Sequence, residues 1–234
     1  MQKKNIFVFL ILTFLIFGFC NCSYAQQTLF NVPSADVTEK GKVFVQHETQ
    51  FSNKFFVNTE YNAFGIGKNT EIDVTLGGVG TNNVANELLG VGFKSFIPLN
   101  KKLYEKYEAK LTYGTLIQTS LRGNGVGNWT YSHLSLRLPK LKTRFTGGVN
   151  VLTTTFAGRD AFGFIGGIEQ PITKRFGLQM DWFSGKHSNG FLIPGFYLIG
   201  PKDVTLWAGY QIHNNKANGD NGFVIEVAKI FSIR

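Results

Sequence analysis

The sequence predicts an all-β protein, an antiparallel up-and-down transmembrane β-barrel of about twelve strands. After residue 41, about a dozen short segments alternate apolar and polar side chains, as strands do when one face meets lipid and the other water. The apolar side chains keep to one face from segment to segment, and most charged side chains fall on the other. Short turns with Pro or Lys alternate with longer loops rich in Gly and Asn, which is typical of such barrels.

The N-terminus has the three parts of a secretory signal peptide. Lys3 and Lys4 supply the positive charge, residues 6–20 form an apolar run, and Ser23-Tyr24-Ala25 is a small-x-small cleavage site. The apolar run is shorter than the ~20 residues that a membrane-spanning helix needs. We therefore predict that residues 1–25 are a signal peptide, that cleavage follows Ala25, and that the protein is exported.

Residues 26–41 are predicted to be a short periplasmic leader, and residues 42–234 the barrel itself. Pro33 and Gly41 interrupt any regular element in the leader. Both cysteines of the chain, Cys20 and Cys22, lie in the predicted signal peptide. The exported part is thus expected to have no disulfide, no cysteine-bound zinc and no thiol nucleophile.

The alternation assigns a face to each side chain of the strands, as the second and third strands show. In residues 55–65 the pattern places Tyr61 and Ala63 on the outer face and Glu60 on the inner face. In residues 70–78 it places Ile72 outside, and Glu71 and Asp73 inside. A slip of one residue in the third strand would put two acids into lipid, so its register is well specified.

The other strands follow the same rule with varying clarity. The first strand has a poor face pattern, and Pro194 weakens the tenth and is expected to mark a bulge. The expected strands cover residues 42–51, 55–65, 70–78, 88–97, 107–117, 129–138, 144–153, 162–170, 175–183, 190–199, 203–212 and 222–232.

The connections between the expected strands alternate in length. Shorter turns fall at 67–69, 98–106, 139–142, 171–174 and 200–202, and longer polar loops at 80–86, 118–128, 154–160, 185–189 and 213–221. Bacterial barrels have short periplasmic turns and longer external loops. Twelve strands would therefore place both termini in the periplasm. The alternative of a secreted β-sandwich also predicts alternation, but its outward faces would be polar.

The alternating strands, the two kinds of connection and the last strand, residues 223–231, resemble the small porin-like outer-membrane β-barrel proteins of Gram-negative bacteria. The resemblance rests on this pattern and not on a diagnostic motif, and it covers residues 41–232. It implies a bacterial outer-membrane location, with outer-membrane lipid and the barrel assembly machinery as partners. Such barrels usually end in an aromatic residue, whereas this chain ends Phe231-Ser232-Ile233-Arg234.

The inner face is the candidate functional surface, and its acids outnumber its bases. An open pore with this charge is expected to prefer cations, whereas a channel for sugar acids should be basic. The alternative is a polar core in which the charges neutralise one another. The residues predicted to face the lumen are Glu60, Glu71, Asp73, Lys94, Glu108, Lys110, Arg137, Arg144, Glu169, Asp181 and Glu226.

Basic residues gather on the turns that we predict to be periplasmic. They would form a rim that contacts the anionic phospholipid headgroups of the inner leaflet, although the plain solubility of turns explains them as well. This basic rim comprises Lys68, Lys101, Lys102, Lys140, Lys142, Lys174, Arg175 and Lys202.

These features favour a narrow passive channel or transporter for small solutes. A non-conducting structural or adhesive barrel that presents its external loops is the alternative, and a barrel-embedded hydrolase is a distant third. The three adjacent loop residues His187, Ser188 and Asn189 are poorly placed to act as nucleophile, base and orienting group. We predict no enzyme activity, metal site, cofactor or nucleic-acid partner.

Overall fold

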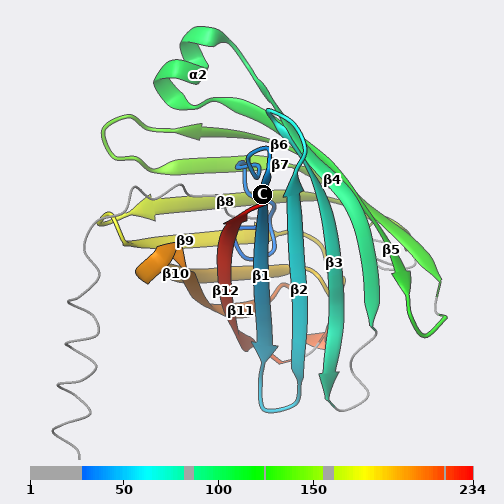
Figure 1. The fold of residues 1–234 in the computed structure, drawn as a ribbon. Coiled ribbons are helices and arrows are strands. Elements are labelled where there is room, and N and C mark those ends of the chain that lie inside the picture. The colour runs from blue at the N-terminus through cyan, green and yellow to red at the C-terminus, as the bar shows by residue number, and fades with distance from the viewer. Residues whose placement is uncertain (1–27, 82–86, 124, 155–160, 219, 234) are drawn as a thin grey trace, which may run out of the picture.

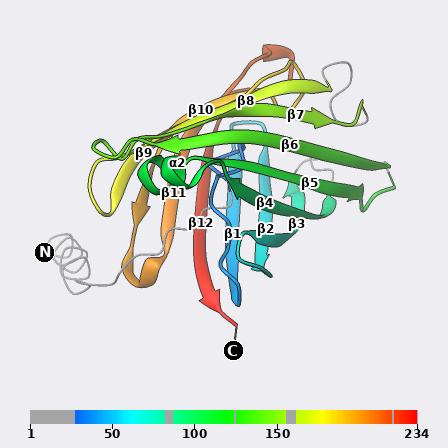
Figure 2. The same ribbon diagram turned by 90° about the horizontal axis from the view of Figure 1, so that it is seen from above.

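Twelve antiparallel strands form a closed barrel in which each strand pairs with its neighbours in chain order and β1 pairs with β12. The computed structural model describes residues 28–81, 87–123, 125–154, 161–218 and 220–233. The predictions of an all-β, up-and-down barrel and of twelve strands are confirmed. Figure 1 views the barrel from the side and Figure 2 from above.

The observed strands lie close to the expected ranges. They are β1 Lys42–Phe51, β2 Phe56–Gly65, β3 Thr70–Thr81, β4 Leu88–Pro98, β5 Lys110–Ser120, β6 Val126–Arg137, β7 Arg144–Leu152, β8 Phe162–Pro171, β9 Phe176–Phe183, β10 Phe191–Ile199, β11 Thr205–His213 and β12 Gly222–Ser232. The fifth strand begins later than expected, because a short helix, α2 (Lys101–Tyr107), occupies the connection before it. Among the described residues, no helix is long and apolar enough to cross a membrane.

The barrel closes through ten residue pairs between β1 and β12, from Lys42 opposite Ser232 to Phe51 opposite Phe223. Closure removes the free strand edges that would otherwise expose unpaired backbone groups. The expected bulge at Pro194 is absent, because the register of β10 against β11 is the same on both sides of it. Pro194 lies opposite Met180 of β9 and has no partner on β11.

The outer wall is apolar over most of its height. Large aliphatic side chains such as Val91, Leu134 and Ile117 are half exposed there. Aromatic side chains gather towards both ends of the wall, with Phe51 stacked on Phe223 near one end. A broad apolar band with aromatic residues at both borders is what a lipid bilayer requires of a barrel.

The two ends of the barrel differ in their connections. At one end lie the turns β2–β3, β4–β5, β6–β7, β8–β9 and β10–β11, together with the start of β1 and the end of β12; we call it the short-turn end. The other end carries the remaining connections and we call it the long-loop end, although its β1–β2 connection spans only residues 52–55. The described parts of the chain do not include residues 82–86 and 155–160 of its loops.

The chain segment before β1 lies inside the barrel. Residues 28–38, which we call the inner segment, include Leu29, Phe30 and Val32, all with no exposed surface. Figures 1 and 2 show the segment in blue between the walls. The sequence led us to expect a leader outside the barrel, which is wrong for these residues. Burial is favoured because the lumen shields three apolar side chains and supplies an acceptor for the backbone N–H groups of Phe30 and Val32.

Candidate channel lumen

The inner segment is held first by one carboxylate of the wall. Oδ2 of Asp181 on β9 accepts hydrogen bonds from the backbone N–H groups of Phe30, Asn31 and Val32, at 3.0, 2.7 and 2.7 Å. The side-chain amide of the nearby Gln179 donates to the carbonyl of Leu29. Three successive N–H groups aimed at one carboxylate oxygen form an anion-binding nest, here filled by the protein's own side chain.

A second anchor joins Asp36 of the inner segment to two basic residues at the starts of β5 and β7. Lys110 Nζ on β5 lies 3.1 Å from Asp36 Oδ1, and Arg144 Nη1 on β7 lies 2.6 Å from Asp36 Oδ2. Burial raises the pKa of Asp36, but the charges and hydrogen bonds of Arg144 and Lys110 outweigh burial and hold this pKa far below its usual value. Asp36 is therefore ionised throughout the neutral range, and the three groups form a charged cluster.

A third anchor lies on β3 and β4. Lys94 Nζ forms an ion pair with Glu71 Oε1 at 2.9 Å, and their side chains are 0% and 1% exposed. The other oxygen of Glu71 accepts the backbone N–H of Thr38 at 2.5 Å. The carboxylate thus balances a buried lysine and fixes the end of the inner segment at the same time.

Apolar contacts complete the docking. Phe30 packs in a cluster with Phe44, Ile193 and Trp207, whereas Leu29 and Val32 pack in another with Tyr131 and Phe183 among its members. Glycines in the wall make room for these side chains. A Cβ at Gly167 on β8 would collide with Leu29, and one at Gly209 on β11 would lie 2.9 Å from the ring of Phe30.

The charges of the lumen are separated across it. The basic residues lie on β4 to β7, where Lys94, Lys110 and Arg144 each contact a carboxylate. On the opposite side, Glu48 of β1 and Glu226 of β12 lie directly across from each other and are 1% and 0% exposed. Basic groups therefore line one side of the lumen, and two facing carboxyl groups lie on the other side, at the β1–β12 seam.

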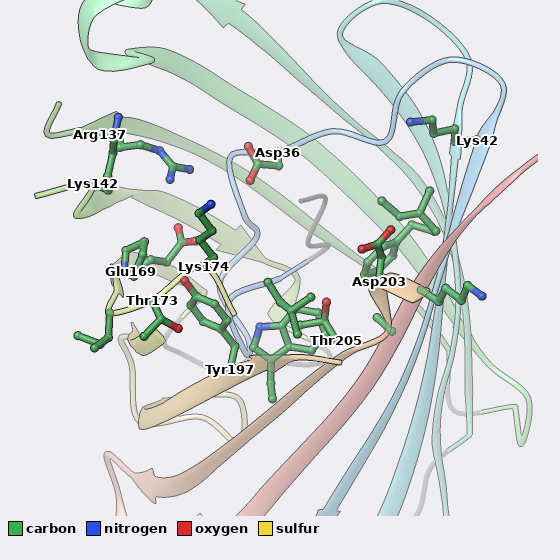
Figure 3. Close-up of a pocket in the computed structure, with 18 of the residues that line it drawn as sticks. Asp36, Lys42, Arg137, Lys142, Glu169, Thr173, Lys174, Tyr197, Asp203 and Thr205 are labelled. Carbon is green, nitrogen blue, oxygen red and sulfur yellow. The ribbon is translucent and has the colours of Figure 1, made fainter. Parts of the chain in front are cut away.

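A cavity of about 660 Å³ opens at the short-turn end, below the turns β6–β7, β8–β9 and β10–β11. Figure 3 shows Arg137 and Lys142 on one side of this cavity and Lys42 on the other. Tyr197 and Trp207 add aromatic surface to its lining. The cavity reaches Asp36, so the inner segment forms part of its lining.

Two residues predicted for the lumen lie elsewhere. Glu60 is on the outer wall, where its side chain is 43% exposed and contacts His47, because Tyr61 and Ala63 take the inward positions of β2. The face assigned to β2 was therefore inverted. Glu108 precedes β5 and caps α2 in a left-handed conformation, with φ of 50°. It reaches Arg137 and Arg144 from the mouth, at 3.0 and 3.8 Å.

The other predicted lumen residues point inward. Glu71, Asp73, Lys94, Lys110, Arg144, Asp181 and Glu226 are buried, and Glu169 and Arg137 are partly exposed beside the mouth cavity. Sequence reasoning missed Asp36 and Glu48. Three apolar residues in an otherwise polar leader were the signal that the segment with Asp36 is buried. Glu48 could not be assigned to the lumen because both faces of β1 mix apolar and polar residues.

The residues of the predicted basic rim lie on the turns of the short-turn end. Lys68, Lys101, Lys102, Lys140, Lys142, Lys174 and Lys202 are exposed and Arg175 is half-buried. Large aliphatic side chains are exposed beside them, including Ile66, Leu103, Leu141 and Ile172. The rim thus presents apolar and basic groups together.

The described residues include no group of three or more His, Cys, Asp or Glu side chains that could hold a metal ion. His187, one of the three adjacent loop residues considered for catalysis, is buried and packs edge-on against Phe183, with ring centroids 5.6 Å apart. Its Nδ1 accepts the backbone N–H of Asn189 at 3.2 Å. This contact occupies the nitrogen that an orienting group would need to bind.

Solved structures with the same architecture are porins. The chain matches the NanC porin with a TM-score of 0.54 and 12% identity, covering 82% of this chain and 99% of that one. It matches a KdgM porin, solved with disordered oligogalacturonate, with a TM-score of 0.51 and 9% identity, over 82% and 99% of the two chains. The fold is that of a porin barrel.

An outer-membrane channel from Pseudomonas putida also aligns, with a TM-score of 0.45 and 10% identity, over 84% of this chain and 98% of that one. No family model matches the sequence, and the comparison with curated proteins finds no match.

Proposed function

We propose that this protein is a narrow passive channel of the bacterial outer membrane whose inner segment occupies the lumen in the described state. The observation that carries the proposal is the way the segment is held. Its anchors are Asp181, Glu71, Lys110 and Arg144, all of them side chains of the wall. The strand pairs that close the barrel do not include the segment, so it can move while the wall stays intact.

The membrane location is supported by the wall itself. A soluble protein does not keep a band of half-exposed apolar side chains over most of its circumference. The porin-type fold of NanC and KdgM agrees with this location. An exported chain with a cleaved signal peptide, as the sequence predicts, would reach the outer membrane from the periplasm.

The charge of the lumen supports transport of small polar solutes with a mild preference for cations. The described interior holds the carboxyl groups of Asp36, Glu48, Glu71, Asp73, Glu169, Asp181 and Glu226, against the bases Lys94, Lys110 and Arg144. Asp36, Glu71 and Glu169 form ion pairs with these bases, whereas Glu48 and Glu226 lie opposite each other on β1 and β12. A displaced inner segment would expose these two groups to permeating ions.

A non-conducting structural barrel is the second candidate. The full burial of Leu29, Phe30 and Val32 favours it, because their apolar contacts resemble a protein core more than a loosely held plug. In that case the loops of the long-loop end would carry the function.

The experiment is single-channel recording of the full-length exported protein in a planar bilayer, with a salt gradient to measure ion selectivity. We expect discrete steps and a reversal potential that shows cation preference. The double variant E48Q/E226Q is expected to lose the preference and to keep the steps. A matched control, E108Q, removes one acid at the mouth and is expected to change selectivity less. A correctly folded barrel that never conducts, even after its inner segment is released, would contradict the channel.

A further inference from the structure

A patch of polar side chains lies on the outer wall of β1 and β2. We call it the outer polar patch, and it consists of His47, Thr49, Asn58, Glu60 and Asn62. These residues face outward because the intervening positions face the lumen: Gln46 and Glu48 of β1 are buried. Strands β1 and β2 are at the front of the barrel in Figure 1.

The patch is ordered by a continuous chain of hydrogen bonds across the two strands. His47 Nδ1 lies 2.5 Å from Glu60 Oε1, and His47 Nε2 lies 3.1 Å from Thr49 Oγ1. Thr49 Oγ1 in turn donates to Asn58 Oδ1 at 2.9 Å. The patch is therefore built of directed donors and acceptors and not of loosely solvated side chains.

The height of the patch makes it unusual for a lipid-facing wall. His47 is the sixth of ten residues in β1 and lies opposite Val227, the middle residue of β12. On the other side, Glu60 lies opposite Leu76 in the middle of β3. The side chains of His47 and Glu60 are nevertheless 47% and 43% exposed. Hydrocarbon offers them no hydrogen bonds, and ionisable groups on the lipid face are most unfavourable at this depth.

Another polar position of the outer wall has a simpler explanation. Lys229 lies near the end of β12, where its Nζ is 5.1 Å from the centroid of the Phe231 ring. A lysine there reaches the headgroup region with its amine. The outer polar patch is in the middle of the strands and has no such route to water.

We propose that the outer polar patch is an interface with a second copy of this chain, arranged about a two-fold axis that passes beside His47 and Glu60. A two-fold contact brings the same surface of both copies together, so the surface must complement itself. The patch does so because it carries a basic and an acidic group side by side. Rotation places His47 of one copy against Glu60 of its partner.

The amides of Asn58 and Asn62 complement themselves in the same way, since each amide both donates and accepts. Pairing of the two copies removes all five side chains from lipid at once. The inference rests on the membrane location in the proposed function, but not on conduction.

The test measures the mass of the full-length exported protein in detergent by analytical ultracentrifugation with subtraction of the bound detergent. We expect a dimer for the native protein. The double variant H47V/E60V, which makes the patch apolar, is expected to raise the dissociation constant at least tenfold. The matched control T115V/T130V removes another outer hydrogen-bonded pair, on β5 and β6, where the two hydroxyls are 2.9 Å apart, and should leave the dimer intact.

A second measurement covers the protein in its own membrane. The variant V45C places a cysteine two residues from His47 on the same face of β1. We expect a bismaleimide to cross-link this variant as a dimer in the membrane. The variant V45C/H47V/E60V should give no cross-linked dimer. A native protein that is monomeric in both measurements, or that carries lipopolysaccharide or another protein on the patch instead, overturns the proposal. So does dissociation of the T115V/T130V control. A dimer that does not conduct would contradict the channel and leave this inference standing.

Discussion

Replacing Asp181 with alanine should release the inner segment from the wall. The carboxylate is 1% exposed, and its Oδ2 accepts the backbone N–H groups of Phe30, Asn31 and Val32 at 3.0, 2.7 and 2.7 Å. Alanine leaves these three donors without an acceptor in the place where they are docked. The strand pairs of β9 remain, because they are made by backbone atoms.

The size of the effect follows from the donors that lose their partner. A buried donor left unsatisfied costs about 1–3 kcal/mol. Three donors at the low end of this range give about 3 kcal/mol in favour of the undocked segment, which is on the order of a hundredfold change in the equilibrium. Asparagine keeps an oxygen in the same position, so D181N should shift the equilibrium by roughly 1–2 kcal/mol.

Single-channel recording measures the change as open probability, and protease cleavage within residues 28–38 measures it independently. We expect both the open probability and the cleavage within residues 28–38 to be highest for D181A, intermediate for D181N and lowest for the native protein. E226A is the control, because it removes an equally buried carboxyl group that holds no backbone N–H of the inner segment. Equal cleavage of D181A and the native protein would refute the role that we give to Asp181.

Three further predictions concern the other charged groups. K94M leaves Glu71 buried without its cation and should lower the free energy of unfolding of the barrel by about 3–5 kcal/mol. Unfolding in urea is followed by the gel mobility of the unheated protein. The double variant K94M/E71M should recover most of the lost stability. The folded-state pKa of Asp36 lies far below the 3.8 of the free side chain, so its contribution to docking is present above about pH 4 and is lost only as the pH falls further. Protection of the inner segment from protease should therefore not change between pH 8 and pH 5. A loss of protection near pH 6 would contradict this reasoning. Anionic phospholipid should bind the rim more weakly, by about 1 kcal/mol per lysine, when Gln replaces Lys101, Lys102, Lys140 and Lys142. Native mass spectrometry measures the binding as the amount of lipid retained. Unchanged retention would leave the solubility of the turns as the explanation for these lysines.

The strands were predictable from the sequence because lipid and water impose opposite demands on alternate residues. In β3 the acids Glu71 and Asp73 alternate with Ile72 and Val74, so one register alone keeps charge out of lipid. The sequence KKLYEKY between β4 and β5 was taken as turn and the start of a strand. The structure makes it α2, which Asn100 caps by accepting the N–H of Lys102 at 2.9 Å.

The face of β2 could not be predicted by the same rule. Both of its faces mix apolar and polar residues, and the rule of apolar residues outside holds only where the lumen contains water. Here the lumen is packed, and Ala63 lies in an apolar cluster with Phe30 of the inner segment. Tyr61 and Ala63 therefore face inward on β2, and Glu60 faces outward.

The inner segment was missed for a different reason. The groups that hold it to Asp181 are backbone N–H groups, which every residue except proline has and which leave no trace in the sequence. The ion pairs of Asp36 do involve side chains, but Lys110 and Arg144 lie far from Asp36 along the chain. Pairing of residues so distant cannot be read from one sequence.

The contact between the inner segment and Asp181 also constrains the order of assembly. The bonded groups are 149 to 151 positions apart in the chain, so docking must wait until β9 has been made and placed. The segment leads directly into β1, which is one side of the seam with β12. β12, the last strand of the chain, thus closes the wall against β1, which directly follows the inner segment. Such non-local contacts carry a large entropic cost before they form and slow the folding reaction. Enclosure of the segment and sealing of the seam should therefore be one late event, and a chain without residues 28–38 would be free to close earlier.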